Sequence, residues 1–266
     1  MNLKNTARTI WQELFNALLS IRHGPTELNN EEKNILSVIK KEGFYIIPNF
    51  YSKTECDEIR NEIDILLEKY KNQVAIDDTA SDHRILGADR ISSLILKFFE
   101  HPFIRKIIYA HEQTKNIVGF TLAAKLEYKT SNLGSGGGWH RDRTTGKQIK
   151  ALLYLTDVDV NNGPFQYLKR SHRPLNIIKE CASENFEFNQ SRFDNKQIEK
   201  LINKKYKEKL LTLTGKAGTI VFVNTRGIHR GMPIEKGVRY SLTNYYWSNM
   251  PIPKHVKELM VKKLDQ

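Results

Sequence analysis

The second half of the chain is a series of short strand-length runs, and this series limits the folds that the chain can adopt. Glycine, asparagine and proline separate several of the runs, as is typical of strands joined by turns. A block of strands after a block of helices favours an α+β or mainly β protein with an antiparallel jelly-roll core and flanking helices. Strands are expected at residues 118–128, 150–160, 163–169, 210–214, 218–224 and 239–247.

Helices are expected before this block. Ser52, with Glu55 three residues later, has the spacing of a capping box and is expected to begin a helix that runs to about Tyr70. Pro102 is expected to break a longer helical segment. Apolar spacing predicts helices at residues 8–21, 30–41, 52–70 and 90–112, and local composition predicts a strand at 43–50 and a loop at 76–88.

The chain divides on this pattern into a helical extension at 1–41, a core domain at 42–250 and a C-terminal helix at 251–266. A lysine-rich segment at about 175–209 interrupts the strands and is expected to be a helical insertion, which could cover a site as a lid. The amphipathic helix at 8–21 is expected to pack on the main body or on a second copy in a homodimer.

Composition narrows the class of protein. The 266 residues suit one large domain. The absence of a long apolar segment and of a signal-peptide pattern indicates a cytoplasmic protein without a transmembrane segment. Two cysteines outside any Cys-x-x-Cys pair give no support to a zinc or redox motif. The net charge of +12 would attract nucleic acid, an anionic membrane or an acidic substrate, although a solvated lysine surface explains it equally well.

Three residues form a candidate metal site. His140 and Asp142 follow a glycine-rich stretch, and residues two apart on a strand point to the same side. His229 comes just after a strongly apolar strand, and only folding can bring it to the other two. Two imidazoles and one carboxylate are the ligand set of the non-haem Fe(II) oxygenases, with open positions for a co-substrate and O₂. A His-x-Asp pair alone is weak, because a lone histidine more often makes a structural hydrogen bond.

A candidate anchor strengthens this interpretation. Arg239 begins the strand after His229, where a turn and an antiparallel pair could bring its guanidinium beside the metal. Its planar fork suits a carboxylate. Ser241 lies on the same face of the strand and could bind the same carboxylate. Lys125 could point inward to bind 2-oxoglutarate or an anionic substrate, although a solvated lysine is an equal alternative.

Five segments stand out as motifs: GFYIIPNFYSKTECDEIR (43–60), WHRD (139–142), NNGPFQYLKRSH (161–172), AGTIVFVNTRGIHRG (217–231) and RYSLTNYYW (239–247). In this order they resemble the phytanoyl-CoA dioxygenase family of Fe(II)/2-oxoglutarate oxygenases. The resemblance implies a double-stranded β-helix core, iron on His140, Asp142 and His229, and 2-oxoglutarate anchored by Arg239. Lys169-Arg170 departs from the usual Pro-Gly before Ser171.

The resemblance also implies the type of reaction. Related halogenases have a small residue where this chain has Asp142, so a carboxylate there implies hydroxylation or another oxidation, with release of succinate and CO₂. Four arginines flank the ligands, and as a cluster they favour a small anionic substrate: Arg141, Arg143, Arg226 and Arg230. By strand alternation Arg141 is expected to point away from the metal, whereas Arg143 could lie near the mouth of the site. His172 is expected to order the turn after residues 163–169.

Two other functions stay open on the sequence. A nucleic-acid-modifying oxygenase would explain the positive charge, but no row of basic and aromatic residues suggests a base-stacking platform, so a nucleic-acid partner is not favoured. A cupin-like binding module without turnover would keep the fold alone, and the combination of His140, Asp142, His229 and Arg239 argues against it.

Overall fold

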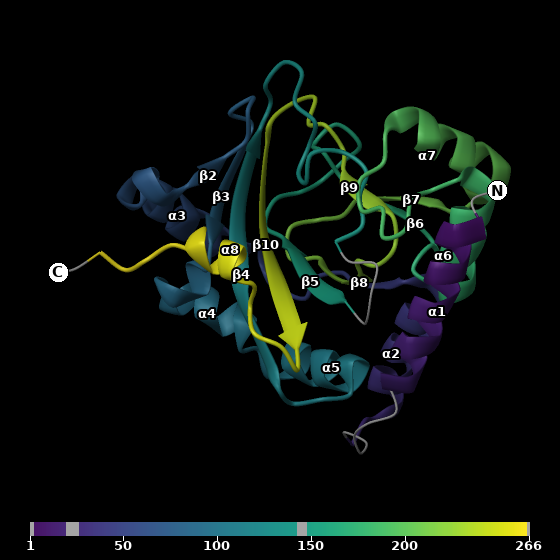
Figure 1. The fold of residues 1–266 in the computed structure, drawn as a ribbon. Helices are drawn as coiled ribbons and strands as arrows, with labels where there is room; N and C mark the ends of the chain where they lie inside the picture. The colour runs from purple at the N-terminus through teal and green to yellow at the C-terminus, as the bar shows by residue number, and fades with distance from the viewer. Residues whose placement is uncertain (1–2, 20–26, 143–147, 265–266) are drawn as a thin grey trace.

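The computed structural model describes residues 3–19, 27–142 and 148–264, which form a β core with flanking helices (Figure 1). The helices are α1 (Leu3–Leu19), α2 (Asn30–Glu42), α3 (Lys53–Lys69), α4 (Ser93–Phe99), α5 (Pro102–Glu112), α6 (Pro174–Glu184), α7 (Asn195–Leu201) and α8 (Lys254–Glu258). The strands are β1 (Phe44–Ile47), β2 (Ala75–Ile76), β3 (Asp82–Leu86), β4 (Ile117–Glu127), β5 (Ile149–Tyr154), β6 (Phe165–Leu168), β7 (Leu210–Leu213), β8 (Ile220–Asn224), β9 (His229–Gly231) and β10 (Val238–Ser248).

The strands make two antiparallel sheets. The larger has the order β1-β8-β5-β10-β4-β3-β2, and the smaller has the order β7-β6-β9. The neighbours β1-β8-β5-β10-β4 are distant in sequence, as in a jelly roll, where the chain crosses repeatedly from one sheet to the other, whereas β4, β3 and β2 are consecutive strands. The predicted fold class, a double-stranded β-helix core with flanking helices, is confirmed.

The helices α2 to α5 pack on the outer face of the larger sheet. Their isoleucines and Phe98 form one buried cluster with residues of the sheet such as Leu153, Phe222 and Leu242. Each fully buried side chain of this size stabilises the fold by about 1.5–3 kcal/mol relative to exposure. The larger sheet is therefore held rigid from outside, and its inner face is left for a pocket.

Strand β10 shows how the two faces are separated. Successive side chains of a strand point to opposite faces. Tyr240, Leu242 and Tyr246 belong to the buried cluster under the helices. Arg239 and Ser241 line the pocket between the sheets. The alternation that made this segment readable as a strand thus also places its polar residues on the inner face.

The predicted helical insertion is present as α6, α7 and a π-helical segment at Ile202–Tyr206. It packs around its own cluster of apolar residues, which includes Trp139, Phe193 and Ile228. Helix α1 lies beside α6 (Figure 1). The insertion and α1 together form a second layer next to the smaller sheet.

Helix α1 packs the opposite way from the expectation that its apolar side would meet the main body. Among residues 3–15, whose side chains the structure describes, the buried ones are polar: Thr9 contacts Cys181, and Glu13 pairs with Arg226. Its large apolar side chains are exposed on the outer side, among them Ile10, Trp11, Leu14 and Phe15. The buried ion pair fixes the orientation of α1, because an unpaired buried carboxylate would cost more than exposed apolar surface.

Two predictions about where helices begin are confirmed, and the prediction of a loop at 76–88 is not. The capping box of Ser52 and Glu55 is formed, and Pro102 opens α5 after a break in the helix. The expected loop at 76–88 is wrong, since it contains β3. Polar Asp82 and Arg84 pair with each other on this strand and hide its apolar alternation.

The C-terminal helix expected over 251–266 is limited to Lys254–Glu258. None of the described helices is long and apolar enough to cross a membrane.

Candidate metal centre and pocket

The fold brings His140, Asp142 and His229 together. One ligand atom from each lies within 4.8 Å of the others. The Nε2 atom of His140 is 3.6 Å from Asp142 Oδ1, and that of His229 is 3.8 Å from Asp142 Oδ2. The backbones of His140 and His229 also pair with each other in both directions, with N···O distances of 2.9 Å. This antiparallel bridge aligns two ligands that are far apart in sequence.

Both histidines present the nitrogen that a metal requires. The Nδ1 atoms of His140 and His229 lie 2.8 Å from the carbonyl oxygens of Gly138 and Gly227. A carbonyl can only accept a hydrogen bond, so Nδ1 carries the proton and Nε2 keeps its lone pair towards Asp142. Burial lowers the pKa of His229 to about 3 and also lowers the pKa of His140. Both rings are therefore neutral at pH 7, as metal ligands must be.

Asp142 is ionised for a different reason. Its burial raises the pKa, but the charge of Lys150, whose ammonium lies 2.6 Å from Oδ2, together with the two imidazoles brings the net pKa well below the usual range. Lys150 is the reciprocal case: burial lowers its pKa, and Asp142 raises it more. The site therefore holds a permanent carboxylate between two neutral imidazoles and one cation.

The glycine-rich stretch before His140 is required by space. Gly136 has φ +92°, and a Cβ there would lie 2.5 Å from Cε1 of the His140 ring. Arg192 from the insertion donates to the carbonyl oxygens of Gly136 and Gly137. A side chain at Gly136 would therefore displace a metal ligand, and the insertion holds the same loop from outside.

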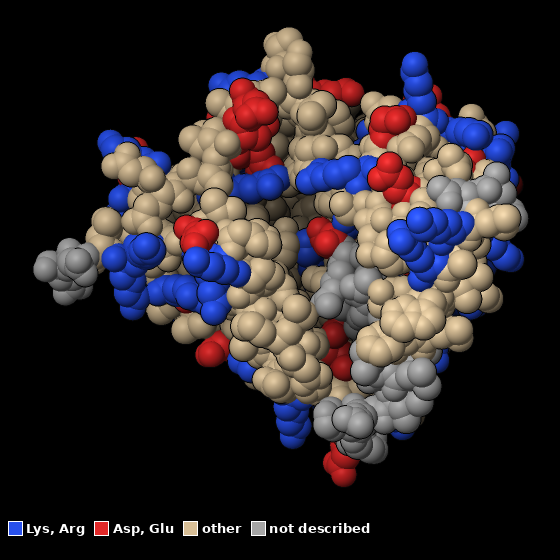
Figure 2. All heavy atoms as spheres, in the orientation of Figure 1, with Lys and Arg blue, Asp and Glu red and all other residues tan. Residues whose placement is uncertain are grey.

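A pocket lies beside these residues, between the two sheets. Figure 2 shows the surface hollowed between β10 and β9. Four strands contribute apolar side chains to its walls: Leu122, Leu152, Phe165 and Val223. Three cations also line it: Arg84, Lys150 and Arg239. The pocket thus combines water-excluding walls with positive charge next to the three ligands.

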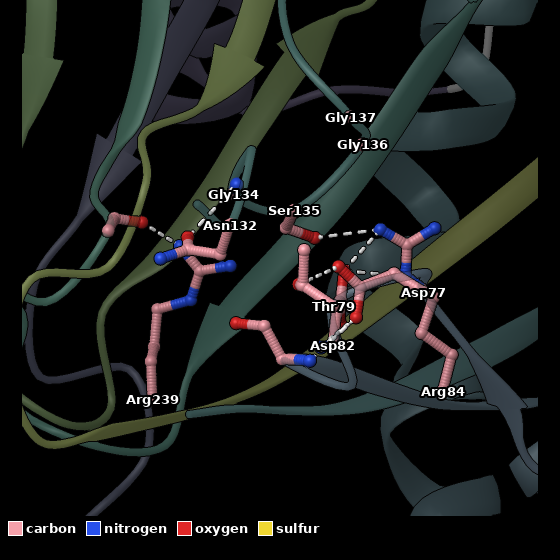
Figure 3. A network of polar contacts seen from close by, with 12 residues as sticks. Asp77, Thr79, Asp82, Arg84, Asn132, Gly134, Ser135, Gly136, Gly137 and Arg239 are labelled. Atoms are coloured by element: carbon pink, nitrogen blue, oxygen red, sulfur yellow. Dashed lines mark hydrogen bonds and ion pairs between the residues drawn. The ribbon is translucent and has the colours of Figure 1, made fainter. Parts of the chain in front are cut away.

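Arg239 is buried in this pocket, where its charge interacts with Asp82 without forming an ion pair. Its guanidinium donates to the carbonyl of Gly163, and its Nε has no hydrogen-bond partner within the described residues. No ion pair joins it to a carboxylate in the described part of the chain, whereas Arg84 pairs with Asp82 and contacts Ser135 (Figure 3). Burial lowers the pKa of Arg239, but a guanidinium stays protonated. A buried, uncompensated cation is suited to an anionic ligand. Ser241 is next to it on the same face of β10.

Lys125 does not belong to this site, which corrects the sequence prediction. Its ammonium pairs with Asp64 of α3 at 3.1 Å and with Glu127 at 3.3 Å. In the register of the sheet Lys125 lies opposite Tyr240, whose side chain is on the helix side, and not opposite Arg239. The alternation along β4 therefore turns Lys125 away from the pocket.

The arginines predicted to surround the ligands are also placed differently. Arg141 is buried against Glu180, and Arg226 is buried against Glu13. Arg230 stacks on Trp139 and donates to Gln166. Arg143 lies outside the described residues. Arg141 thus turns away from the metal, as strand alternation predicted, and attaches the insertion. The prediction of a substrate-binding arginine cluster is wrong for Arg226, which attaches α1.

His172 lies in the turn after β6, as expected. Its Nε2 is 3.1 Å from the carbonyl of Lys40, and burial lowers its pKa to about 4. Arg170, which departs from the family pattern, adopts φ +69° and pairs with Glu42. This turn thus connects β6 to α2 and does not enter the pocket.

Lys150 and Arg84 are two pocket residues that were not predicted from the sequence. Both alternate with apolar residues on strands that line the pocket. A charged residue within an otherwise apolar strand, such as Lys150 in the run IKALLY, was an available signal. Arg84 was missed because its strand was read as a loop.

The fold and the site define a class of protein: a jelly roll with two histidines and one carboxylate beside a pocket between the sheets. The profile of the phytanoyl-CoA dioxygenase (PhyH) family matches residues 39–235. The chain belongs to this family. A search of curated proteins gave no match.

Solved structures with the same fold are non-haem enzymes. The epimerase SnoN, described in complex with Fe³⁺, α-ketoglutarate and nogalamycin RO, has a TM-score of 0.62 and 16% identity, covering 82% of this chain and 84% of its own. The carbocyclase SnoK from nogalamycin biosynthesis has a TM-score of 0.60 and 22% identity, covering 85% and 87%. HygX from Streptomyces hygroscopicus, with nickel and 2-oxoglutarate bound, has a TM-score of 0.57 and 16% identity, covering 84% and 88%. At these identities the likeness shows the fold.

Proposed function

We propose that this protein is an Fe(II)- and 2-oxoglutarate-dependent dioxygenase that hydroxylates a small organic molecule. The observation that carries the proposal is the convergence of two imidazole Nε2 atoms and one carboxylate within 4.8 Å. This donor set on one side of an ion is typical of Fe(II) oxygenases, because it leaves positions for a chelating 2-oxo acid and for O₂. Membership of the family and the ligands of its structural neighbours support the same cofactors.

Each residue then has a defined role. His140, Asp142 and His229 would hold the metal, with the ring orientations set by Gly138 and Gly227. When bound, the metal and 2-oxoglutarate supply the oxidising chemistry, with consumption of O₂ and release of succinate and CO₂.

The buried guanidinium of Arg239 would bind the far carboxylate of 2-oxoglutarate, with Ser241 as a second donor. The four apolar side chains of the walls would exclude water from the reacting carbon.

The substrate and the assembly are further parts of this proposal. Neighbours with this fold are an epimerase and a carbocyclase, so the assignment of hydroxylation rests on Asp142 and not on the fold. If the substrate is anionic, Arg84 is its candidate partner, because its side chain lines the pocket and is 30% exposed. In a homodimer, the exposed side of α1 would be the surface that a second copy covers, and light scattering of a Trp11→Glu variant tests this.

The first experiment adds Fe(II) and 2-oxoglutarate to the anaerobic protein and records the weak visible charge-transfer band. We expect a band in the wild type, a much weaker one in Arg239→Ala, and no change in Arg105→Ala, an arginine on α5 outside the pocket. His140→Ala should abolish substrate-stimulated succinate formation. Bound iron without a band in the wild type would refute the proposal and favour a binding module without turnover.

A further inference from the structure

Lys150 is an unusual neighbour for a metal ligand. It enters the pocket from β5, its side chain is 7% exposed, and its Nζ lies 2.6 Å from Asp142 Oδ2. The same ammonium lies 3.6 Å from the centre of the Tyr245 ring, which holds it by a cation–π contact. A buried cation that binds a metal ligand competes with the metal for that carboxylate. Its presence therefore requires a reason other than metal affinity.

The two oxygens of Asp142 have different surroundings. Both oxygens face the ligand cluster, with Oδ1 3.6 Å from His140 Nε2 and Oδ2 3.8 Å from His229 Nε2, but only Oδ2 is also bound by Lys150. A carboxylate free on both sides can bind a cation through one oxygen or through two. Two-oxygen binding would occupy one of the positions that a chelating 2-oxo acid and O₂ need.

We propose that Lys150 is a positioning residue that restricts Asp142 to one-oxygen ligation and so keeps the metal open for 2-oxoglutarate. The inference rests on the proposed function for the identity of the co-substrate. The Lys150–Asp142 pair also neutralises the carboxylate before metal is loaded, which limits the cost of keeping it inside the protein. Tyr245 keeps the ammonium on the Oδ2 side.

This role makes a prediction that a purely structural lysine does not. In Lys150→Met, Asp142 loses its cation, so both oxygens become available and a nearby repulsive charge disappears. We expect divalent metal to bind about tenfold more tightly or better, because Coulomb interactions at such short distances are large. We expect 2-oxoglutarate to chelate about tenfold more weakly, since the carboxylate takes one of its positions. The two affinities should therefore change in opposite directions.

The measurements use the metal and the co-substrate separately. Titration with Co(II) alone gives the metal affinity, and its visible spectrum reports the coordination number. Anaerobic titration of the Fe(II) protein with 2-oxoglutarate gives the second affinity. Lys150→Arg should restore values near those of the wild type, because it keeps a cation beside Oδ2.

Lys125→Met is the matched control, since Lys125 is an ion-paired lysine on the other face of the same sheet. It should change neither affinity. If Lys150→Met proves poorly folded, Tyr245→Leu removes the ring that holds the ammonium and should shift both affinities in the same opposite directions by a smaller factor.

Equal weakening of both affinities, or no change in either, would overturn the inference. Failure of the proposed function looks different: the wild type would bind Co(II) but would not chelate 2-oxoglutarate. The Co(II) titration would still decide whether Lys150 competes with the metal for Asp142. Tighter Co(II) binding in Lys150→Met depends only on the Lys150–Asp142 pair and not on 2-oxoglutarate.

Discussion

The ion pair of Arg141 and Glu180 gives the clearest stability prediction. Their side chains are 4% and 1% exposed, and Tyr206 donates a further hydrogen bond to Glu180. Glu180→Gln keeps the volume but leaves a buried guanidinium without its counter-charge. Removing one partner of a buried pair costs about 3–5 kcal/mol. At roughly 2–4 °C per kcal/mol for a chain of this size, Tm should fall by roughly 6–20 °C.

The assay is urea unfolding at pH 7, compared with Glu42→Gln as the control. Glu42 accepts two hydrogen bonds from Arg170, but their side chains are 21% and 37% exposed. Solvent screening reduces such a pair to at most about 1 kcal/mol. A loss in Glu180→Gln no larger than that in Glu42→Gln would show that the Arg141 pair is not shielded as described, and the reasoning from burial would fail.

Two other predictions concern pH and the glycine-rich stretch. The folded-state pKa of His172 is about 4, below its unfolded value near 6.5, so the unfolded chain binds the proton first and stability is lost as pH falls from about 6.5 to 4. The free energy of unfolding should fall by up to about 3 kcal/mol over this pH range. Urea unfolding at several pH values should show a shallower dependence of this free energy on pH in His172→Gln than in the wild type. Identical slopes in the two proteins would contradict the prediction. Gly136→Ala should lower Co(II) affinity at least about tenfold, because the new Cβ meets the His140 ring, whereas Gly138→Ala meets no atom within 4 Å and should weaken it less.

The core of the site was predictable because its signals are local or follow the family pattern. Arg239 and Ser241 share one face of a strand by simple alternation, and His140 and Asp142 lie two residues apart. Lys125 was predicted wrongly because alternation says which residues share a face but not which face meets the pocket. That choice depends on the pairing of β4 with β10, where Lys125 is opposite Tyr240.

The prediction of an arginine cluster that attracts the substrate failed for a related reason. The acidic partners of Arg141 and Arg226 come from α6 and α1, which are remote in sequence. A charge beside a metal ligand in the sequence gives no information on which distant carboxylate neutralises it. Position in the sequence therefore indicated the ligands well and the electrostatics of their surroundings poorly.

The reciprocal backbone bridge between His140 and His229 has a consequence for how the protein loses and regains its metal ion. Because main-chain hydrogen bonds align the two imidazoles, their spacing does not depend on an ion to draw them together. The entropy cost of ordering the two ligand side chains is therefore incurred when the chain folds and not when the metal binds. Loss of the ion, by chelation or by oxidation and release, should therefore leave a folded protein that can be recharged with fresh metal many times without passing through an unfolded state.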